Sequence, residues 1–194
     1  MRTVFFDIDT QIDFLFPAGA LYVPGAETLM PALSRLNHYA AAHGIPLIST
    51  TCAHAEDDPE FRQWPAHCVL GTVGQQKPSD LLLGKRIVIP AAPGSFPVEG
   101  AGQIILQKNQ LDLTTNPHFS RLLEHLKADA YFVYGVVTEY CVRLAALALL
   151  KTGKPVNLIT DAIQTLRAAD SGQTITECTG AGARLTTAAE VCAQ

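Results

Sequence analysis

Three side chains in this sequence could together perform nucleophilic catalysis. Asp9 directly follows an apolar run, Lys108 closes a second run, and Cys141 lies near the start of an apolar helical segment. The carboxylate of Asp9 could act as a general base, and the ammonium of Lys108 could pair with it or stabilise an anion. Because a helix N-terminus lowers the pKa of a thiol and presents N–H donors, the position of Cys141 is typical of a thiolate nucleophile beside an oxyanion hole.

Each of these residues also has a structural explanation when it is taken alone. An aspartate at the end of a strand commonly caps a turn, and a lysine at the start of a loop is commonly solvated. A cysteine near the start of an apolar helix equally suits a buried core. The catalytic interpretation therefore depends on a fold that brings the three side chains together.

Short β-rich runs alternate with helical segments along the chain, and this order predicts the scaffold. The predicted strands are residues 3–8, 46–51, 86–89, 103–106, 131–136 and 156–160, and the predicted helices are residues 26–42, 117–127, 138–152 and 168–180. Several strands are almost continuously apolar, as parallel strands buried on both faces are. We therefore expect an α/β fold, a three-layer α/β/α sandwich with a mainly parallel, doubly wound central sheet. Ligands of such sheets bind at the carboxyl ends of the strands, where Asp9 and Lys108 are expected.

The composition argues against several classes of protein. Of the 194 residues, 48% are hydrophobic and 16% are charged, and the formal net charge is −4. These values argue against intrinsic disorder and predict a single domain over residues 1–194. The mild acidity, with no run of lysine or arginine, argues against nucleic acid or an anionic membrane as the main partner. Because no apolar stretch approaches the roughly 18 residues that span a bilayer, and no signal peptide is recognisable, we expect a cytoplasmic protein.

The chain has five cysteines, an odd number, and none of them forms a CxxC pair. In a reducing compartment this pattern indicates free thiols rather than a disulfide framework. Each thiol is then core, ligand or nucleophile. The cysteines are at positions 52, 68, 141, 178 and 192.

Four blocks of the sequence resemble the isochorismatase-like cysteine hydrolases, the family that includes the nicotinamidases. The resemblance extends over almost the whole chain, with the blocks in the family's order and approximate spacing. The blocks are residues 9–14 (DTQIDF) with 23–26 (VPGA), residues 64–68 (WPAHC), Lys108, and residues 135–142 (GVVTEYCV).

The resemblance implies a catalytic triad of Asp9, Lys108 and Cys141. In this family Asp9 would take the thiol proton, Cys141 would attack the carbonyl of a small amide, and water would cleave the resulting thioester. Lys108 would hold the carboxylate and the thiolate in register and favour their ionised forms. The resemblance also implies an oxyanion hole made by the backbone N–H groups of Val137 and Cys141, and a cis peptide bond between Val136 and Val137.

The implied function is that of a cysteine amidohydrolase, which in a nicotinamidase converts nicotinamide and water to nicotinate and ammonia. Phe14 and Trp64 match positions at which nicotinamidases hold the pyridine ring between aromatic faces. Residues 109–113 and 116–119 depart from the nicotinamidase pattern, so another small amide, a ureide or an isochorismate-like compound remains an alternative substrate. A non-catalytic binding protein is a further alternative. The presence of Cys141 argues against the isochorismate branch, and the complete triad argues against a non-catalytic role. The family's habit also implies a homo-oligomer.

A divalent metal is the one cofactor that the resemblance raises. Nicotinamidases bind it through an Asp-x-His pair, a second His six residues later and the His of the WPxHC block. The corresponding residues here are Cys52, His54, Glu60 and His67. Sulfur, nitrogen and oxygen ligands are all acceptable to zinc, so the set could bind Zn²⁺. The other interpretation is a lost site, with both histidines in a hydrogen-bonded loop.

The other cysteines and Asp13 are expected to be structural. Cys68 adjoins apolar residues, and Cys178 and Cys192 belong to no motif. Asp13 is expected to order the first loop rather than to catalyse.

Overall fold

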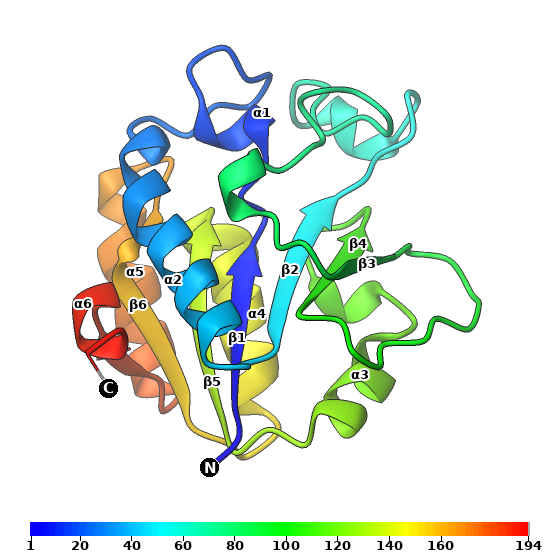
Figure 1. Ribbon diagram of the computed structural model, residues 1–194. Helices are drawn as coiled ribbons and strands as arrows, with labels where there is room; N and C mark the ends of the chain where they lie inside the picture. The colour runs from blue at the N-terminus through cyan, green and yellow to red at the C-terminus, as the bar shows by residue number, and fades with distance from the viewer. Residues whose placement is uncertain (194) are drawn as a thin grey trace.

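The computed structural model describes residues 1–193, and in this range seven parallel strands form one sheet (Figure 1). The sheet order is β3-β4-β2-β1-β5-β6-β7. The predicted α/β fold with a parallel central sheet is confirmed. The strands are β1 (Thr3–Ile8), β2 (Leu47–Cys52), β3 (Arg86–Ile89), β4 (Gln103–Lys108), β5 (Ala130–Val136), β6 (Val156–Gln164) and β7 (Arg184–Thr186).

Helices cover both faces of the sheet. Helix α2 packs on β1 and β2 and against α6, whereas α4 packs on β5 and β6 and against α5, on the opposite face (Figure 1). The α-helices are α1 (Ile12–Leu15), α2 (Met30–Ala42), α3 (Phe119–Leu126), α4 (Arg143–Leu150), α5 (Ala168–Gly180) and α6 (Ala188–Val191). The 3₁₀ segments are η1 (Ala26–Leu29), η2 (Pro59–Arg62), η3 (Ser79–Leu81) and η4 (Leu113–Thr115), and η5 (Thr138–Val142) is a π-helical turn.

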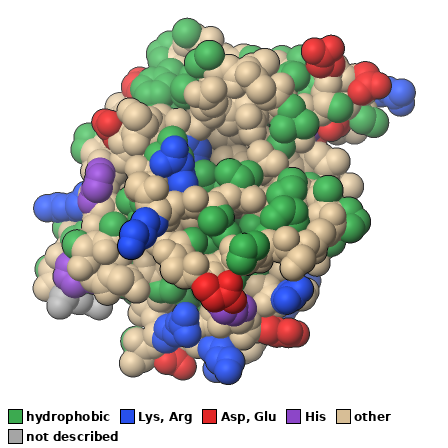
Figure 2. Space-filling model, turned by 45° about the vertical axis from the view of Figure 1, so that its right-hand side comes forward, with side chains coloured by type: hydrophobic (Ala, Val, Ile, Leu, Met, Phe, Trp, Pro, Cys, Tyr) green, Lys and Arg blue, Asp and Glu red, His purple; other side chains and the backbone are tan. Residues whose placement is uncertain are grey.

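The core explains why the strands are so apolar. Val4, Phe5 and Phe6 of β1 are buried on both faces of the sheet, because helices cover each side. Complete burial of a large apolar side chain stabilises the fold by about 1.5–3 kcal/mol, so the central strand is a major source of stability. At the surface, hydrophobic patches lie among scattered acidic and basic side chains on the face drawn in Figure 2. In residues 1–193, none of the helices has the length and apolar character needed to cross a bilayer.

Several predicted element boundaries differ from the structure. The predicted helix 26–42 divides into η1 and α2, with Pro31 in the first turn of α2. Proline has no N–H to donate, so it is tolerated in the first turn but not within a longer helix. The predicted helix 138–152 likewise divides into η5 and α4. The short elements α1, β7 and α6 were not predicted because three or four residues carry too little periodicity.

The topology places a crevice between β1 and β5. The connection after β1 passes through α2 on one face, and the connection after β5 passes through α4 on the other. Since β1 and β5 are neighbours, their carboxyl ends form a topological switch point, the usual ligand site of such sheets. Asp9 follows β1 and Cys141 follows β5 at this point, while Lys108 is the last residue of β4.

Candidate active site

The structure brings Asp9, Lys108 and Cys141 together. The ammonium nitrogen Nζ of Lys108 lies 2.8 Å from Oδ2 of Asp9 and 3.5 Å from Sγ of Cys141. Asp9 and Lys108 are each only 1% exposed, and Cys141 is 5% exposed. A buried carboxylate, ammonium and thiol in contact satisfy the geometric requirement for an activated nucleophile.

Local backbone structure orients Asp9. Its φ of +49° lies in the left-handed region, which aspartate tolerates better than most residues. The hydroxyl of Thr50 donates to Oδ1 of Asp9 at 2.6 Å and accepts from the Asp9 backbone N–H at 3.1 Å. Thr50 was not identified from the sequence. On the neighbouring strand, Gly135 has a φ of +118°, and a Cβ there would collide with the backbone of Ile8. Glycine therefore allows β5 to approach β1 closely.

The pKa shifts define the resting charge state of the triad. Burial opposes the ionisation of Asp9, but the charge and hydrogen bond of Lys108 and the bond from Thr50 outweigh it, so the pKa of Asp9 is lowered. Burial also opposes the charge on Lys108, yet Asp9 and the two nearby thiols hold its pKa well above the usual value. The resting pair is therefore a carboxylate and an ammonium ion.

The expectation of a lowered thiol pKa at Cys141 is wrong. Burial raises the pKa of Cys141 well above its usual value, and the nearby charge of Asp9 adds to this effect, while Lys108 opposes it. Desolvation in this pocket outweighs the favourable position at the start of a helix. Cys141 is therefore a protonated thiol at rest.

Cys141 lies in the π-helical turn η5, directly after β5. The carbonyl of Val137 accepts from the N–H groups of Tyr140 and Val142, each at 3.1 Å. The peptide bond between Val136 and Val137 is cis, as the sequence analysis predicts. Both Val137 and Cys141, the residues expected to form the oxyanion hole, line the same cavity.

A partly open, mainly apolar cavity lies beside the triad. Phe14 and Trp64 line it, as their predicted binding role requires. The ring of Phe14 packs 5.4 Å from that of His67, and Trp64 meets Tyr140 edge to face at 5.5 Å. The lining residues are Asp9, Phe14, Leu21, Cys52, Glu60, Trp64, His67, Leu111, Val136, Val137, Tyr140, Cys141 and Leu166. The apolar members Leu21, Leu111 and Leu166 were not identified from the sequence, because no local pattern distinguishes them from core residues.

Glu139 fixes one wall of the cavity. Its carboxylate accepts from the hydroxyl of Thr165 at 2.7 Å and from the backbone N–H groups of Leu166 at 3.0 Å and Arg167 at 3.3 Å. These bonds hold the loop after β6 so that Leu166 reaches the cavity.

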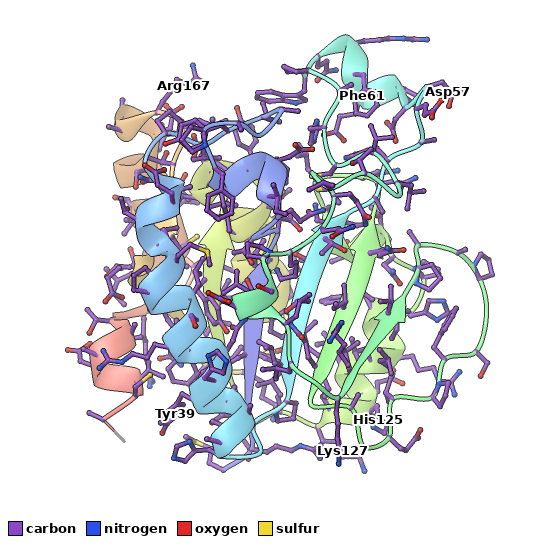
Figure 3. All side chains as sticks on the ribbon, turned by 45° about the horizontal axis from the view of Figure 1, so that its top comes forward. Tyr39, Asp57, Phe61, His125, Lys127 and Arg167 are labelled. Atoms are coloured by element: carbon purple, nitrogen blue, oxygen red, sulfur yellow. The ribbon has the colours of Figure 1, made fainter. Side chains whose placement is uncertain are left out.

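In Figure 3, Arg167 and Phe61 lie at the same end of the molecule, on opposite sides, and Tyr39, His125 and Lys127 lie at the other end.

A second polar cluster adjoins the triad. One ligand atom from each of Cys52, His54 and His67 lies within 4.8 Å of the others, and all three residues are buried. Glu60 belongs to an overlapping group with His54 and Asp58. Three of the four predicted metal ligands, Cys52, His54 and His67, therefore form one group, and Glu60 belongs to a second group that shares His54.

Each of the two histidines uses Nδ1 for a hydrogen bond, which leaves its Nε2 for another partner. Nδ1 of His54 is 2.9 Å from the carboxylate of Asp58, and Nδ1 of His67 is 2.8 Å from the carbonyl of Pro65. Nε2 of His54 is buried and has no hydrogen-bond partner in residues 1–193. Burial lowers the pKa of His67, which favours the neutral ring that binds metals. Two imidazoles oriented by outer partners, together with a thiol, fit a zinc-type ion.

Asp13 orders the first loop, as expected. Its two carboxylate oxygens accept from the backbone N–H groups of Ala20 at 2.9 Å and Cys68 at 2.6 Å. These bonds join the loop after α1 to the WPAHC block. Asp13 thereby helps to place Phe14 and His67 against the cavity.

Comparison with known proteins shows which family and which relatives this chain resembles. Residues 92–190, just over half of the chain, match the family model described as Isochorismatase domain. The chain is 27% identical over 204 residues to a nicotinamidase of Escherichia coli (strain K12), covering 94% of this chain and 93% of that protein. It is also 26% identical to a nicotinamidase of Saccharomyces cerevisiae, covering 79% of this chain and 84% of that protein.

Solved structures share the fold. The pyrazinamidase of Pyrococcus horikoshii in complex with zinc has a TM-score of 0.80 at 24% identity, covering 96% of this chain and 99% of that one. The N-carbamoylsarcosine amidase of Thermoplasma acidophilum has a TM-score of 0.77 at 20% identity, covering 97% of each chain. Because the family model covers half of the chain and the structures share the whole fold, this protein belongs to the isochorismatase family.

Proposed function

We propose that this protein is a nicotinamidase-like cysteine amidohydrolase that converts a small, uncharged aromatic carboxamide and water to the carboxylic acid and ammonia. The observation that carries the proposal is the contact of one buried ammonium, Lys108, with both a carboxylate and a thiol beside an apolar cavity. The curated relatives are nicotinamidases, which supports nicotinamide or pyrazinamide as the type of substrate.

The charge state of the triad constrains the first chemical step. Because the pKa of Asp9 is lowered and that of Cys141 is raised, the proton stays on sulfur until the substrate arrives. Asp9 takes that proton as the sulfur forms its bond to the amide carbon, and Lys108 stabilises the sulfur and the carboxylate through the transfer. The backbone N–H groups of Val137 and Cys141 are the proposed donors to the oxygen that becomes negative.

The remaining steps return the triad to its starting state. The carboxyl proton on Asp9 passes to the leaving nitrogen, the carbon–nitrogen bond breaks, and ammonia departs, leaving a thioester on Cys141. Asp9 then takes a proton from water as the water oxygen attacks the thioester carbon. The carbon–sulfur bond breaks, the acid is released, and Cys141 regains its proton.

The cavity favours an uncharged aromatic substrate. Phe14, Trp64 and Tyr140 supply ring faces and edges, each worth about 0.5–1.5 kcal/mol in aromatic contact. In residues 1–193 no lysine or arginine lines the cavity, whereas Asp9 and Glu60 do. A ureido acid or an isochorismate-like dianion would bring carboxylates to a wall without a cationic side chain, so these anionic substrates are disfavoured. An uncharged ureide remains an alternative substrate.

The proposal includes a divalent metal, with zinc as the preferred ion. Cys52, His54 and His67 would hold it, with Glu60 beside them, since Oε1 of Glu60 lies 3.9 Å from Nε2 of His67. When bound, such an ion supplies a Lewis-acidic position for a lone pair of the substrate. The buried, unpartnered nitrogen of His54 supports this assignment, because leaving such a group without a partner costs about 1–3 kcal/mol.

Ammonia release tests the proposal directly. Purified protein supplied with Zn²⁺ is assayed with nicotinamide, pyrazinamide and N-carbamoylsarcosine. We expect turnover of the two aromatic amides and at least about tenfold lower kcat/KM for the ureido acid, equivalent to about 1.4 kcal/mol. Faster turnover of N-carbamoylsarcosine, or no release of ammonia from either aromatic amide, would contradict the proposed substrate.

Three broader features belong to the same proposal. The free cysteines support a reducing, cytoplasmic location. The single sheet of seven strands supports a single domain. The family resemblance supports a homo-oligomer, which light scattering of the purified protein would test.

A further inference from the structure

The thiol of Cys52 occupies an unusual position, because it touches both polar clusters. Sγ of Cys52 lies 3.2 Å from Nζ of Lys108, closer than the 3.5 Å that separates Nζ from the sulfur of Cys141. It also lies 3.8 Å from Oδ2 of Asp9. On its other side, the same residue groups with His54 and His67. Cys52 therefore stands between the catalytic triad and the histidines.

Cys52 is held in this position by a second residue. The side-chain amide of Gln11 donates to the carbonyl of Cys52 at 2.8 Å and accepts from its N–H at 2.7 Å. Both groups are buried. These two bonds fix the backbone from which the thiol of Cys52 projects.

We infer that Cys52 supplies a thiolate ligand to a zinc-class ion while its sulfur remains hydrogen-bonded to Lys108, so that one sulfur atom joins the metal centre to the triad. This inference rests on the metal site within the proposed function. On binding, the thiol proton passes to solvent and a sulfur–metal bond forms. One thiolate and two imidazoles suit Zn²⁺, Co²⁺ and Cd²⁺ and disfavour Mg²⁺ and Mn²⁺, which prefer oxygen ligands.

The shared sulfur has a consequence for Lys108. The ammonium has three N–H groups and four neighbours: Asp9, Cys52, Cys141 and the carbonyl of Gln110 at 3.1 Å. A metal-bound thiolate carries negative charge that the neutral thiol lacks, so it accepts from Lys108 more strongly. Metal binding therefore alters the electrostatic surroundings of the same lysine that contacts Cys141.

Cobalt spectroscopy tests the ligand without depending on turnover. Protein freed of metal by a chelator is titrated with Co²⁺. We expect a sulfur-to-cobalt charge-transfer band in the near ultraviolet that saturates at one ion per chain and disappears when Zn²⁺, but not Mn²⁺, is added. Cys52→Asp should bind cobalt without this band, and Cys52→Ser should also lack it. The matched control Cys192→Ser should retain the full band, since Cys192 is only partly buried and lies outside both clusters.

A second set of variants tests the bond to Lys108. Lys108→Met removes the donor and should move the charge-transfer band to longer wavelength, because the sulfur lone pair is no longer stabilised. Lys108→Arg, which keeps a cationic donor, should leave the band nearer to its wild-type position. The surface variant Lys151→Met should leave it unchanged.

Several results would overturn the inference. They are cobalt binding without a sulfur band in the wild-type protein, an undiminished band in Cys52→Asp, no cobalt binding, or no shift in Lys108→Met. A protein that shows the predicted bands and shifts but releases no ammonia from nicotinamide would support this inference while contradicting the proposed substrate.

Discussion

Two buried carboxylate–ammonium pairs involve aspartates only two positions apart, yet their surroundings differ. Asp7 in β1 pairs with Lys77 at 3.1 Å, and Asp9, just after β1, pairs with Lys108 at 2.8 Å. The side chains of all four residues are at most 1% exposed. The same two functional groups therefore occur twice, in sites that serve different purposes.

The Asp7 pair is surrounded by oxygen and nitrogen donors. Besides Lys77, the carboxylate accepts from Thr10 at 2.6 Å, Ser49 at 3.1 Å and Asn37 at 3.2 Å. Its acceptor capacity is well used, and it lines none of the cavities described for residues 1–193. Since Lys77 belongs to the long irregular segment between β2 and β3, this pair attaches that segment to the sheet.

The Asp9 pair has weaker hydrogen-bond donors around it. One oxygen accepts from Thr50, but the other partners besides Lys108 are the thiols of Cys52 and Cys141, and sulfur is a weak donor. Asp9 also lines the cavity. A fully satisfied buried ion pair specifies one structure, whereas a pair completed by thiols beside a cavity can exchange a proton with a substrate.

The largest expected effect is on activity, and it concerns Cys141, the thiol beside the Asp9 pair. Cys141→Ser keeps the approximate volume of the side chain but replaces the nucleophile. We expect kcat for ammonia release to fall by at least about 10³-fold, with the melting temperature nearly unchanged, because the loss lies in the reaction and not in the fold. The control Cys178→Ser should retain activity in its folded fraction. Unchanged turnover in Cys141→Ser would contradict a catalytic role for the Asp9 pair and the thiol beside it.

The next effect tests the structural pair. Lys77→Met leaves the buried charge of Asp7 without its cation, so we expect the free energy of unfolding to fall by about 3–5 kcal/mol, measured by urea denaturation. The folded fraction should keep kcat/KM within about threefold of the wild-type value. The double variant Asp7→Asn, Lys77→Met should recover part of the stability. A large loss of kcat/KM in folded Lys77→Met would show that this pair also serves catalysis.

The pH dependence follows from the lowered pKa of Asp9. Because the folded pKa lies below the unfolded value near 3.8, the carboxylate contributes stability that is complete above that value and is lost as the pH falls through the folded pKa. For the same reason, Asp9 should not limit kcat/KM until the pH is below about 3.8. Initial rates between pH 4 and about 8 would check this, and an acid limb near pH 6 that persists at saturating zinc would contradict it.

The smallest effects compare two adjacent residues of β2, Ser49 and Thr50. Thr50→Val removes the donor to Asp9, so we expect kcat/KM to fall about tenfold, corresponding to about 1.4 kcal/mol. Ser49→Ala removes a donor to Asp7, so we expect a loss of about 1 kcal/mol in the free energy of unfolding and unchanged kcat/KM. Reversed effects in the two variants would reverse the roles assigned to the two pairs.

Much of the scaffold was predictable because strands and helices differ in local periodicity. The helix 168–180 was predicted with its observed bounds, and the strands 3–8 and 86–89 likewise. The strand ending at 51 in fact includes Cys52, and the strand ending at 106 extends to Lys108. Gln107 and Lys108 broke the apolar pattern of the second strand, although they continue the sheet. The residues that the predicted strands omitted include a candidate ligand, Cys52, and the lysine of the triad.

The supporting residues of the site were harder to predict. Gln11 and Glu139 lie inside the motif blocks, and that position was the only signal that could have identified them. Thr50 and Lys77 have no local signal, because each acts on a partner far away in the chain. Which hydroxyl or ammonium faces which carboxylate depends on the register of neighbouring strands.

The sequence by itself determined the order of strands and helices and the motif blocks, because these depend on residue type and short-range spacing. The resemblance of those blocks to a known family implied the three triad residues. The tertiary structure alone decided that Cys52 contacts Lys108 across 56 positions of the chain, and that the thiol of Cys141 has a raised pKa. Both results depend on desolvation and on distances between charges. These quantities exist only after distant segments pack together, since the electrostatic free energy of a buried group is set by its neighbours in space.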